Sequence, residues 1–236
     1  MNKISKLKFN IFYDGVNIKN YINDVDGVTT NTSFIAAAKI TNYNKFIEES
    51  LKEVKGKPIS FQVIGRTFSE IENQARFICG LGENVYVKIP VILPDASSTI
   101  PLIKDLSDDG LKINATCIHT LAQIDETIGC LNEKADSIIS VFAGGISDSG
   151  NDPSSLIRHA TQQVQEFNGL RILWAGCQNV LHVFQAAQLG CHIVTVPDAI
   201  MNKLCRTQYS IHETSVRKSN TFFNDGDLLE LVLENT

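Results

Sequence analysis

The chain has 236 residues, of which 43% are hydrophobic and 20% are charged, and its formal net charge is −5 at pH 7. This length suits one large α/β domain or two small ones, and the acidic balance excludes the extended basic face of a nucleic-acid-binding protein. No stretch approaches the roughly 20 consecutive apolar residues that span a bilayer, and the start, MNKISKLKFN, lacks the apolar core of a signal peptide. We therefore expect a cytoplasmic protein that binds neither nucleic acid nor membrane.

Short apolar runs predict strands, and amphipathic runs between them predict helices. In chain order, the strand-like runs cover residues 8–14, 26–31, 59–65, 84–90, 113–118, 137–143, 171–176 and 192–197. The helix-like runs include residues 46–54, 68–81, 120–131, 153–167 and 179–190. Asp152 followed by Pro153 indicates the start of one helix, and Gly190 indicates the end of another.

Near-continuous apolar strands that alternate with helices are typical of a parallel sheet covered by helices. Repeats of this kind along the whole chain predict one domain over residues 1–236, a (β/α)₈ TIM barrel. The alternative is a doubly wound open sheet, which usually carries a G-x-G-x-x-G turn after its first strand. Here that turn reads Asp14-Gly15-Val16-Asn17, which favours the barrel.

Polar residues interrupt the apolar runs where a barrel would place its active site, at the C-terminal ends of the strands. In chain order they are Asp14, Thr29, Thr30, Asn31, Gln62, Lys88, Asn114, Thr116 and Ser140, with the aromatic Phe142 after them. One polar residue inside a strand is usually a satisfied core group. A carboxylate, an amine, amides and hydroxyls that converge on one barrel mouth indicate an active site instead.

Lys88 lies within the strand-like run NVYVKIPV. Burial disfavours the charged form of a lysine, and the neutral amine can attack a ketone or aldehyde to form a Schiff base. Such a cycle needs a general acid/base, and Asp14 is the strand-end carboxylate available for it. Gln62 and Thr116 could hold a water that relays protons. Alternatively, Lys88 is structural, and its amine reaches solvent or pairs with Asp14.

The segments GVTTNTS (27–33), VKIP (87–90), INATCIHTLAQ (113–123) and AGGISDSGND (143–152) resemble the transaldolase family. The similarity runs from about Phe9 to the C-terminus and is greatest to the small subfamily that includes fructose-6-phosphate aldolase. The resemblance implies a (β/α)₈ barrel that uses a covalent iminium and neither a metal nor an organic cofactor. The six cysteines agree with this expectation, because their spacing predicts reduced thiols and no zinc site.

By resemblance, Lys88 is the Schiff-base lysine and Asp14 the acid/base carboxylate. Asn31 and Asn114, whose amides could bind hydroxyls of a polyol, are implied to hold the substrate, and Thr116 is implied to position the catalytic water. Such enzymes transfer or release a dihydroxyacetone unit from a ketose or ketose phosphate. The subfamily also implies a homo-oligomer, and we expect the apolar tail of about residues 207–236 to form a C-terminal helix extension outside the barrel or on a neighbouring subunit.

Two positions disagree about whether transfer or release dominates. Gln62 stands where transaldolases usually have glutamate and where the aldolase has glutamine. Ser140 and Phe142 follow the transaldolase pattern, whereas the aldolase has tyrosine in place of Phe142.

The family's phosphate ligands are also replaced. Gly145 stands in place of an arginine after the sixth strand, and Gly176 and Gln178 stand in place of a serine and a basic residue after the seventh. Backbone N–H groups at Gly176 could still bind an anion, or Arg158, Arg171 or Lys203 could form a displaced site. The preferred interpretation is a substrate without the usual phosphate, for which Trp174 is a candidate platform and His119 a further contact. A non-catalytic sugar-binding barrel is the remaining alternative.

Overall fold

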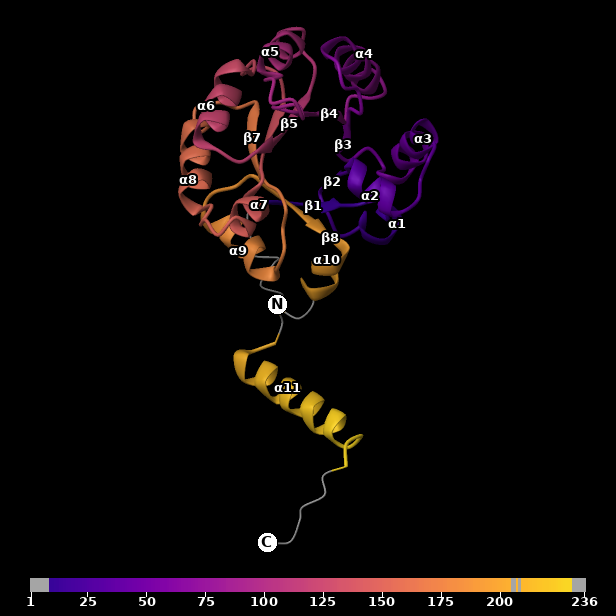
Figure 1. Cartoon of the computed structure of the whole chain (residues 1–236), viewed down its shortest axis with the longest axis vertical. Coiled ribbons are helices and arrows are strands. Elements are labelled where there is room, and N and C mark those ends of the chain that lie inside the picture. Colours follow the sequence, from indigo (N-terminus) through magenta and orange to yellow (C-terminus); the bar gives the residue numbers. More distant parts are fainter. Residues whose placement is uncertain (1–8, 205–206, 208, 231–236) are drawn as a thin grey trace. The chain divides into compact units, whose positions relative to one another are not determined.

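Eight parallel strands close into a barrel in chain order, each hydrogen-bonded to the next (Figure 1). The computed structural model describes residues 9–204, 207 and 209–230. The strands are β1 (Asn10–Asp14), β2 (Gly27–Thr29), β3 (Ile59–Gln62), β4 (Val85–Pro90), β5 (Ile113–Ile118), β6 (Ser137–Val141), β7 (Leu170–Trp174) and β8 (Ile193–Pro197). The prediction of a (β/α)₈ barrel is confirmed.

Closure depends on the pairing of the first strand with the last. β1 and β8 are in parallel register over five residue pairs, from Asn10 opposite Ile193 to Asp14 opposite Pro197. This pairing leaves no open sheet edge and rules out the doubly wound alternative. Because all strands run the same way, their C-terminal ends meet at one mouth.

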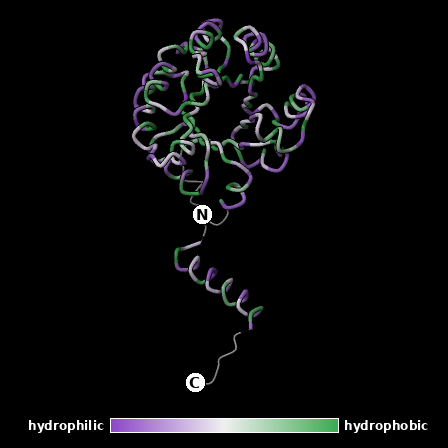
Figure 2. The backbone as a smooth tube through the Cα atoms, in the orientation of Figure 1, coloured by the Kyte–Doolittle hydropathy of each residue, from purple (hydrophilic) through white to green (hydrophobic). Residues whose placement is uncertain are grey.

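The helices of the barrel unit lie outside the ring of strands, and hydrophilic residues gather on their outer sides (Figures 1 and 2). Those that begin within the barrel unit are α1 (Ile18–Tyr21), α2 (Thr32–Ala37), α3 (Tyr43–Glu53), α4 (Phe68–Cys79), α5 (Ile100–Asp108), α6 (Leu121–Cys130), α7 (Ala143–Asp148), α8 (Ser154–Gln163), α9 (Val180–Gln188) and α10 (Asp198–Leu204). Capping boxes begin α4 at Thr67 and α6 at Thr120, where each threonine accepts from the third helical N–H. The helices expected from the sequence are all present, with bounds that differ by a few residues.

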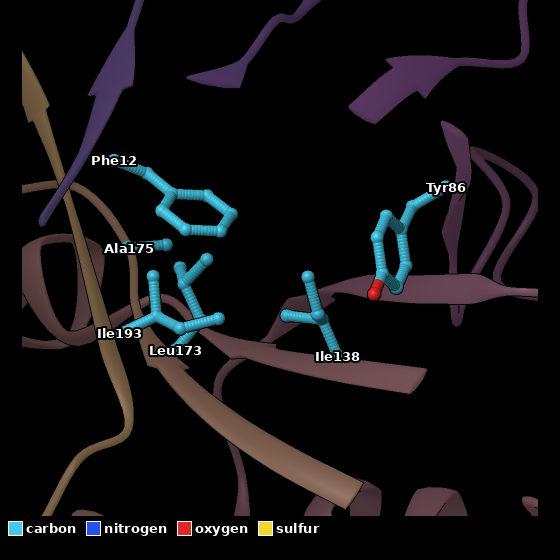
Figure 3. Close-up of a cluster of buried hydrophobic side chains, with 6 residues drawn as sticks. All are labelled: Phe12, Tyr86, Ile138, Leu173, Ala175 and Ile193. Atoms are coloured by element: carbon cyan, nitrogen blue, oxygen red, sulfur yellow. The ribbon is translucent and has the colours of Figure 1, made fainter. Parts of the chain in front are cut away.

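Apolar side chains fill the barrel interior below the mouth. Phe12, Tyr86, Ile138, Leu173, Ala175 and Ile193 form one buried cluster, contributed by β1, β4, β6, β8 and the end of β7 (Figure 3). Below it, the Arg171 guanidinium donates to the Tyr86 hydroxyl at 2.6 Å and also to the Asp136 carboxylate. The interior is therefore a packed core, as expected for a barrel of eight strands.

The chain divides into two compact units, residues 8–201 and a second unit made of residues 1–7 and 202–236. The described part of the second unit contains the last residues of α10 and the whole of α11 (Ile211–Gly226). Helix α11 begins with a capping box at Ser210. None of the α11 residues is buried, and Phe222 and Phe223 on it are largely exposed. Lys8 of the first predicted strand, and residues 208 and 231–236 of the predicted tail, lie outside the described residues. Among the described helices, none is both long and apolar enough to cross a bilayer.

Candidate active site

A lysine and an aspartate are buried together at the mouth of the barrel. Lys88 of β4 is 4% exposed and Asp14, the last residue of β1, is 9% exposed. Both side chains face the barrel interior, and two residues before them on the same strands lie Phe12 and Tyr86 of the buried apolar cluster. Two opposite charges therefore share a site that largely excludes water.

Burial shifts the proton equilibria of both groups toward their neutral forms. The pKa of Lys88 is lowered mainly by desolvation, which the negative charge of Asp14 opposes. The pKa of Asp14 is raised mainly by desolvation, which Lys88 and a hydrogen bond from Thr29 oppose. The lysine Nζ is 3.5 Å from the carbonyl oxygen of Thr30, to which it donates. A lowered pKa increases the share of the lysine in its nucleophilic neutral form, and a raised pKa brings the proton exchange of the carboxyl closer to neutral pH.

Hydroxyl groups from the neighbouring strands hold Asp14. The Thr29 hydroxyl donates to Asp14 Oδ1 at 2.8 Å, and it also contacts the hydroxyl of Thr195 on β8. Because the Thr29 proton goes to the carboxylate, Thr195 acts as the donor to Thr29. The closure of β1 onto β8 thus builds a chain of two hydroxyls behind the carboxylate.

A second polar chain crosses the adjacent wall of the barrel. The Asn114 amide donates to the Ser60 hydroxyl at 2.9 Å and accepts from the Ser140 hydroxyl at 2.7 Å. All three side chains are buried. Gln62, Lys88 and Asn114 are register partners in β3, β4 and β5, so these side chains emerge on one face of the sheet. The structure therefore places Asn114 beside the lysine, with its amide orientation fixed.

Thr116 has a buried hydroxyl with no hydrogen-bond partner in the structure. It is the register partner of Pro90, two residues beyond Lys88 on β4, and thus lies at the mouth above the lysine. A buried hydroxyl without a partner is unusual and marks a place for a water or a ligand group. Immediately after it the ladder is irregular, and Cys117 adopts a positive φ of 64°.

Asn31 and Gln62 have side chains outside these two chains. Asn31 is the N-cap of α2, and its Oδ1 accepts from the backbone N–H of Phe34 at 3.0 Å. The backbone carbonyl of Gln62 accepts from the Tyr43 hydroxyl at 2.7 Å, while the Gln62 side chain is half-buried beside Lys88. Asn31 can offer only its amide N–H groups without loss of the cap.

The ends of β6 and β7 approach each other closely. A Cβ at Gly144 would lie 1.9 Å from the carbonyl oxygen of Gly176, which itself has a φ of +71°. A Cβ at Gly145 would lie 2.8 Å from Nε2 of His119. Gln178 donates through Nε2 to Asp148 Oδ2 at 2.7 Å and to the Gly144 carbonyl at 3.3 Å. Gly144, Gly145, Gly176 and Gln178 thus carry no cationic side chain.

The structure separates Trp174 from the other candidates. Leu173 and Ala175 face the interior, so Trp174 between them points to the outer face of the barrel. Its ring lies 5.2 Å from that of His182 on α9, and its Nε1 is buried without a partner. Phe142, by contrast, packs against the interior cluster and lies 5.2 Å from the His119 ring.

Sequence reasoning missed Ser60 and Thr195. The two hydroxyl residues each stand singly in an apolar run, and the inward phase of their strands was the signal that could have identified them. Asp148 lies among turn-forming residues, which favour a solvated turn, and in the structure it accepts from Gln178. Within the described part of the chain, no group of three or more histidine, cysteine, aspartate or glutamate side chains could hold a metal ion.

Comparisons with known proteins agree on one kind of relative. A family model described as Transaldolase/Fructose-6-phosphate aldolase matches residues 11–234. A "Probable transaldolase" of Streptococcus equi subsp. zooepidemicus is 34% identical over 221 residues, which are 91% of this chain and 96% of that protein. One from Streptococcus agalactiae serotype V is 33% identical over 211 residues, 88% of this chain and 90% of that protein.

A solved structure resembles the chain in fold. The crystal structure of the Amycolatopsis orientalis BexX/CysO complex matches with a TM-score of 0.53 and 16% identity, over 82% of this chain and 81% of that one. At this identity, the likeness concerns the barrel architecture alone.

Proposed function

Since the chain belongs to the transaldolase/fructose-6-phosphate aldolase family, we propose that it is a Schiff-base enzyme that takes a dihydroxyacetone unit from a ketose. The observation that carries the proposal is the buried pair at the barrel mouth, Lys88 with a lowered pKa and Asp14 with a raised one. The unit is then passed to an aldehyde or released to water.

In the first half of the reaction the neutral Lys88 amine attacks the ketose carbonyl carbon. The carbinolamine formed loses its hydroxyl as water, and the product is a protonated imine. The positive nitrogen withdraws electrons, so the bond between the third and fourth carbons of the ketose breaks as a base removes the proton of the hydroxyl on the fourth carbon. An aldehyde leaves, and the three-carbon unit stays on Lys88 as an enamine.

In the second half the enamine attacks an acceptor aldehyde, and the new alkoxide takes up the proton. Hydrolysis of the resulting imine frees the new ketose and restores the amine. If the enamine instead takes a proton from water, hydrolysis releases dihydroxyacetone. Both outcomes use the same lysine and the same proton carrier.

Asp14 is the proton carrier in this proposal. Its raised pKa suits a group that gives and takes a proton at neutral pH. The unpartnered hydroxyl of Thr116 supports a relay in which one water lies between the carboxyl and the substrate. Asn114 is fixed by two hydrogen bonds beside Lys88, and it keeps one N–H for a hydroxyl of the bound unit.

Reductive trapping tests the proposal. The wild-type protein is incubated with dihydroxyacetone and borohydride, and its intact mass is measured beside that of Lys88→Ala and of Lys104→Ala, which removes an exposed lysine on α5. We expect an adduct of one dihydroxyacetone unit on the wild type and on Lys104→Ala, and none on Lys88→Ala. An adduct that persists in Lys88→Ala would move the chemistry to another amine, and no adduct at all would refute the Schiff base.

A further inference from the structure

The mouth of the barrel over β5, β6 and β7 has an uneven charge. We define the rim as residues 117–120, 142–153 and 175–179, which are the segments that follow these three strands. The rim contains Asp148 and Asp152 but neither lysine nor arginine, and all of it belongs to the described part of the chain. A doubly charged phosphate bound in a protein ordinarily meets arginine, lysine or several backbone N–H groups. The side chains of the rim offer it like charge instead.

Gln178 and Asp148 form the polar part of the rim. Both N–H groups of the Gln178 amide are engaged, by Asp148 Oδ2 at 2.7 Å and by the Gly144 carbonyl at 3.3 Å. The pair therefore presents the amide oxygen Oε1 and the carboxylate oxygen Oδ1 as acceptors. Acceptors of this kind bind the O–H of a sugar and repel phosphate oxygens, which are acceptors themselves at neutral pH.

Two rings form the aromatic part of the rim. His119 lies 5.2 Å from Phe142, and its ring is fixed by a contact of 3.1 Å between Nδ1 and the Cys117 carbonyl. The same ring occupies the space beside Gly145 that a side chain there would need. A flat aromatic wall next to oxygen acceptors suits the C–H and O–H faces of a carbohydrate.

The polar wall of the barrel leads from Lys88 to this rim. Asn114 is the register partner of Lys88, and its amide is bonded to Ser140 of β6. Phe142 follows two residues later on the same face of that segment. Gly144, two residues beyond Phe142, accepts from Gln178 through its carbonyl, so these groups follow one another from Lys88 to Gln178. A substrate that is joined to Lys88 and extends along them has its far end at Gln178.

We propose that the rim of His119, Phe142, Asp148 and Gln178 binds the far end of an unphosphorylated, polyhydroxylated substrate and discriminates against a terminal phosphate. The inference rests on the proposed function, because it concerns the same substrate as the Schiff base at Lys88. It assigns the choice between neutral and phosphorylated sugars to the pair Gln178 and Asp148.

The test compares substrates that differ only in the phosphate. Loading of the wild type is followed with fructose and fructose 6-phosphate as donors, and kcat/KM with glyceraldehyde and glyceraldehyde 3-phosphate as acceptors. We expect kcat/KM for each neutral substrate to exceed that of its phosphate ester by about tenfold or more. The double variant Asp148→Asn with Gln178→Arg should shift this ratio toward the phosphate esters by at least about tenfold.

A matched control removes one negative charge elsewhere. Glu133→Gln alters an exposed carboxylate in the loop before β6, at the opposite end of the barrel, and should leave the ratio unchanged. Preference of the wild type for the phosphate esters, or an equal ratio in wild type and double variant, would overturn the inference. Failure of the proposed function is distinguishable, because then dihydroxyacetone, which has no far end, would also give no trapped adduct, and the inference would fall with it.

Discussion

Replacement of Thr29 by valine isolates the hydroxyl that supports Asp14. Valine keeps the shape of the side chain and removes the donor that lies 2.8 Å from Asp14 Oδ1 at a buried position. The hydroxyl stabilises the carboxylate form and so lowers the pKa of Asp14 against the larger effect of burial. Without it, the pKa of Asp14 rises further.

The size of the effect follows from the hydrogen bond. A hydrogen bond to a charged group contributes about 1.5–3 kcal/mol, and about 1.4 kcal/mol corresponds to one pH unit. We therefore expect the acidic limb of the pH profile of kcat/KM to move upward by about one to two pH units, since Asp14 must be ionised to accept a proton.

The free energy of unfolding also depends on the pKa of Asp14. A carboxyl whose pKa is raised by folding binds its proton more tightly in the folded state. This difference therefore costs no stability below the unfolded value of 3.8; the cost grows as pH rises from that value to the folded pKa and is constant above it. The Thr29→Val variant should accordingly lose more stability than the wild type between mildly acidic and neutral pH, as measured by urea unfolding.

Thr195→Val is the matched control. Its hydroxyl contacts that of Thr29 and not the carboxylate, so its removal should move the acidic limb less than Thr29→Val does. An acidic limb that stays in place in Thr29→Val, or one that moves more in Thr195→Val, would refute the role given to this chain of hydroxyls.

Three further changes test other parts of the site. Gly144→Ala places a Cβ 1.9 Å from the Gly176 carbonyl, so we expect a loss of about 2–3 kcal/mol or more in urea unfolding. The control is Gly129→Ala on α6, where the new Cβ meets open space, and its free energy of unfolding should rise by about 0.5–1 kcal/mol. Equal unfolding midpoints for the two variants would contradict the close approach of the loops at Gly144 and Gly176. Asn114→Leu leaves two serine hydroxyls unpaired in the core, and a loss of about 2–4 kcal/mol is expected in the same assay; an unchanged midpoint would show that the chain contributes nothing. Burial lowers the pKa of Lys88 from its ordinary value of 10.5. The rate of its reductive trapping with dihydroxyacetone and cyanoborohydride should therefore stay near its maximum at pH values below 10.5. A trapping rate that declines with falling pH in the same way as that of the exposed lysines would argue against a buried neutral amine.

Apolar runs predicted the strands well because a parallel barrel buries both faces of each strand. The run 113–118 coincides with β5, and 84–90 differs from β4 by one residue. The second and third runs were predicted too long: β2 ends at Thr29 and β3 at Gln62. Beyond these residues the chain turns toward a helix, while the apolar or hydroxyl character of the sequence continues, so composition alone gives no boundary.

The position of a polar residue within its strand predicted much of the site. Asp14, Lys88 and Asn114 share the inner face, which the alternation of side chains along a strand requires. The same alternation turns Trp174 outward toward α9, although its size and position near a strand end made it a candidate platform. Thr195 was not identified, because nothing in the local sequence shows that β8 lies beside β1 until the barrel is closed.

The cluster that fills the barrel has a consequence for the order of events. Phe12, Tyr86 and Leu173 pack together in the interior below Lys88, so the mouth is the side from which molecules reach the lysine. Under the proposed chemistry, the leaving aldehyde and the incoming acceptor must pass through the mouth of the barrel one after the other. The two half-reactions then cannot overlap in time. After the first aldehyde has left, the three-carbon unit stays on Lys88 until the acceptor aldehyde enters.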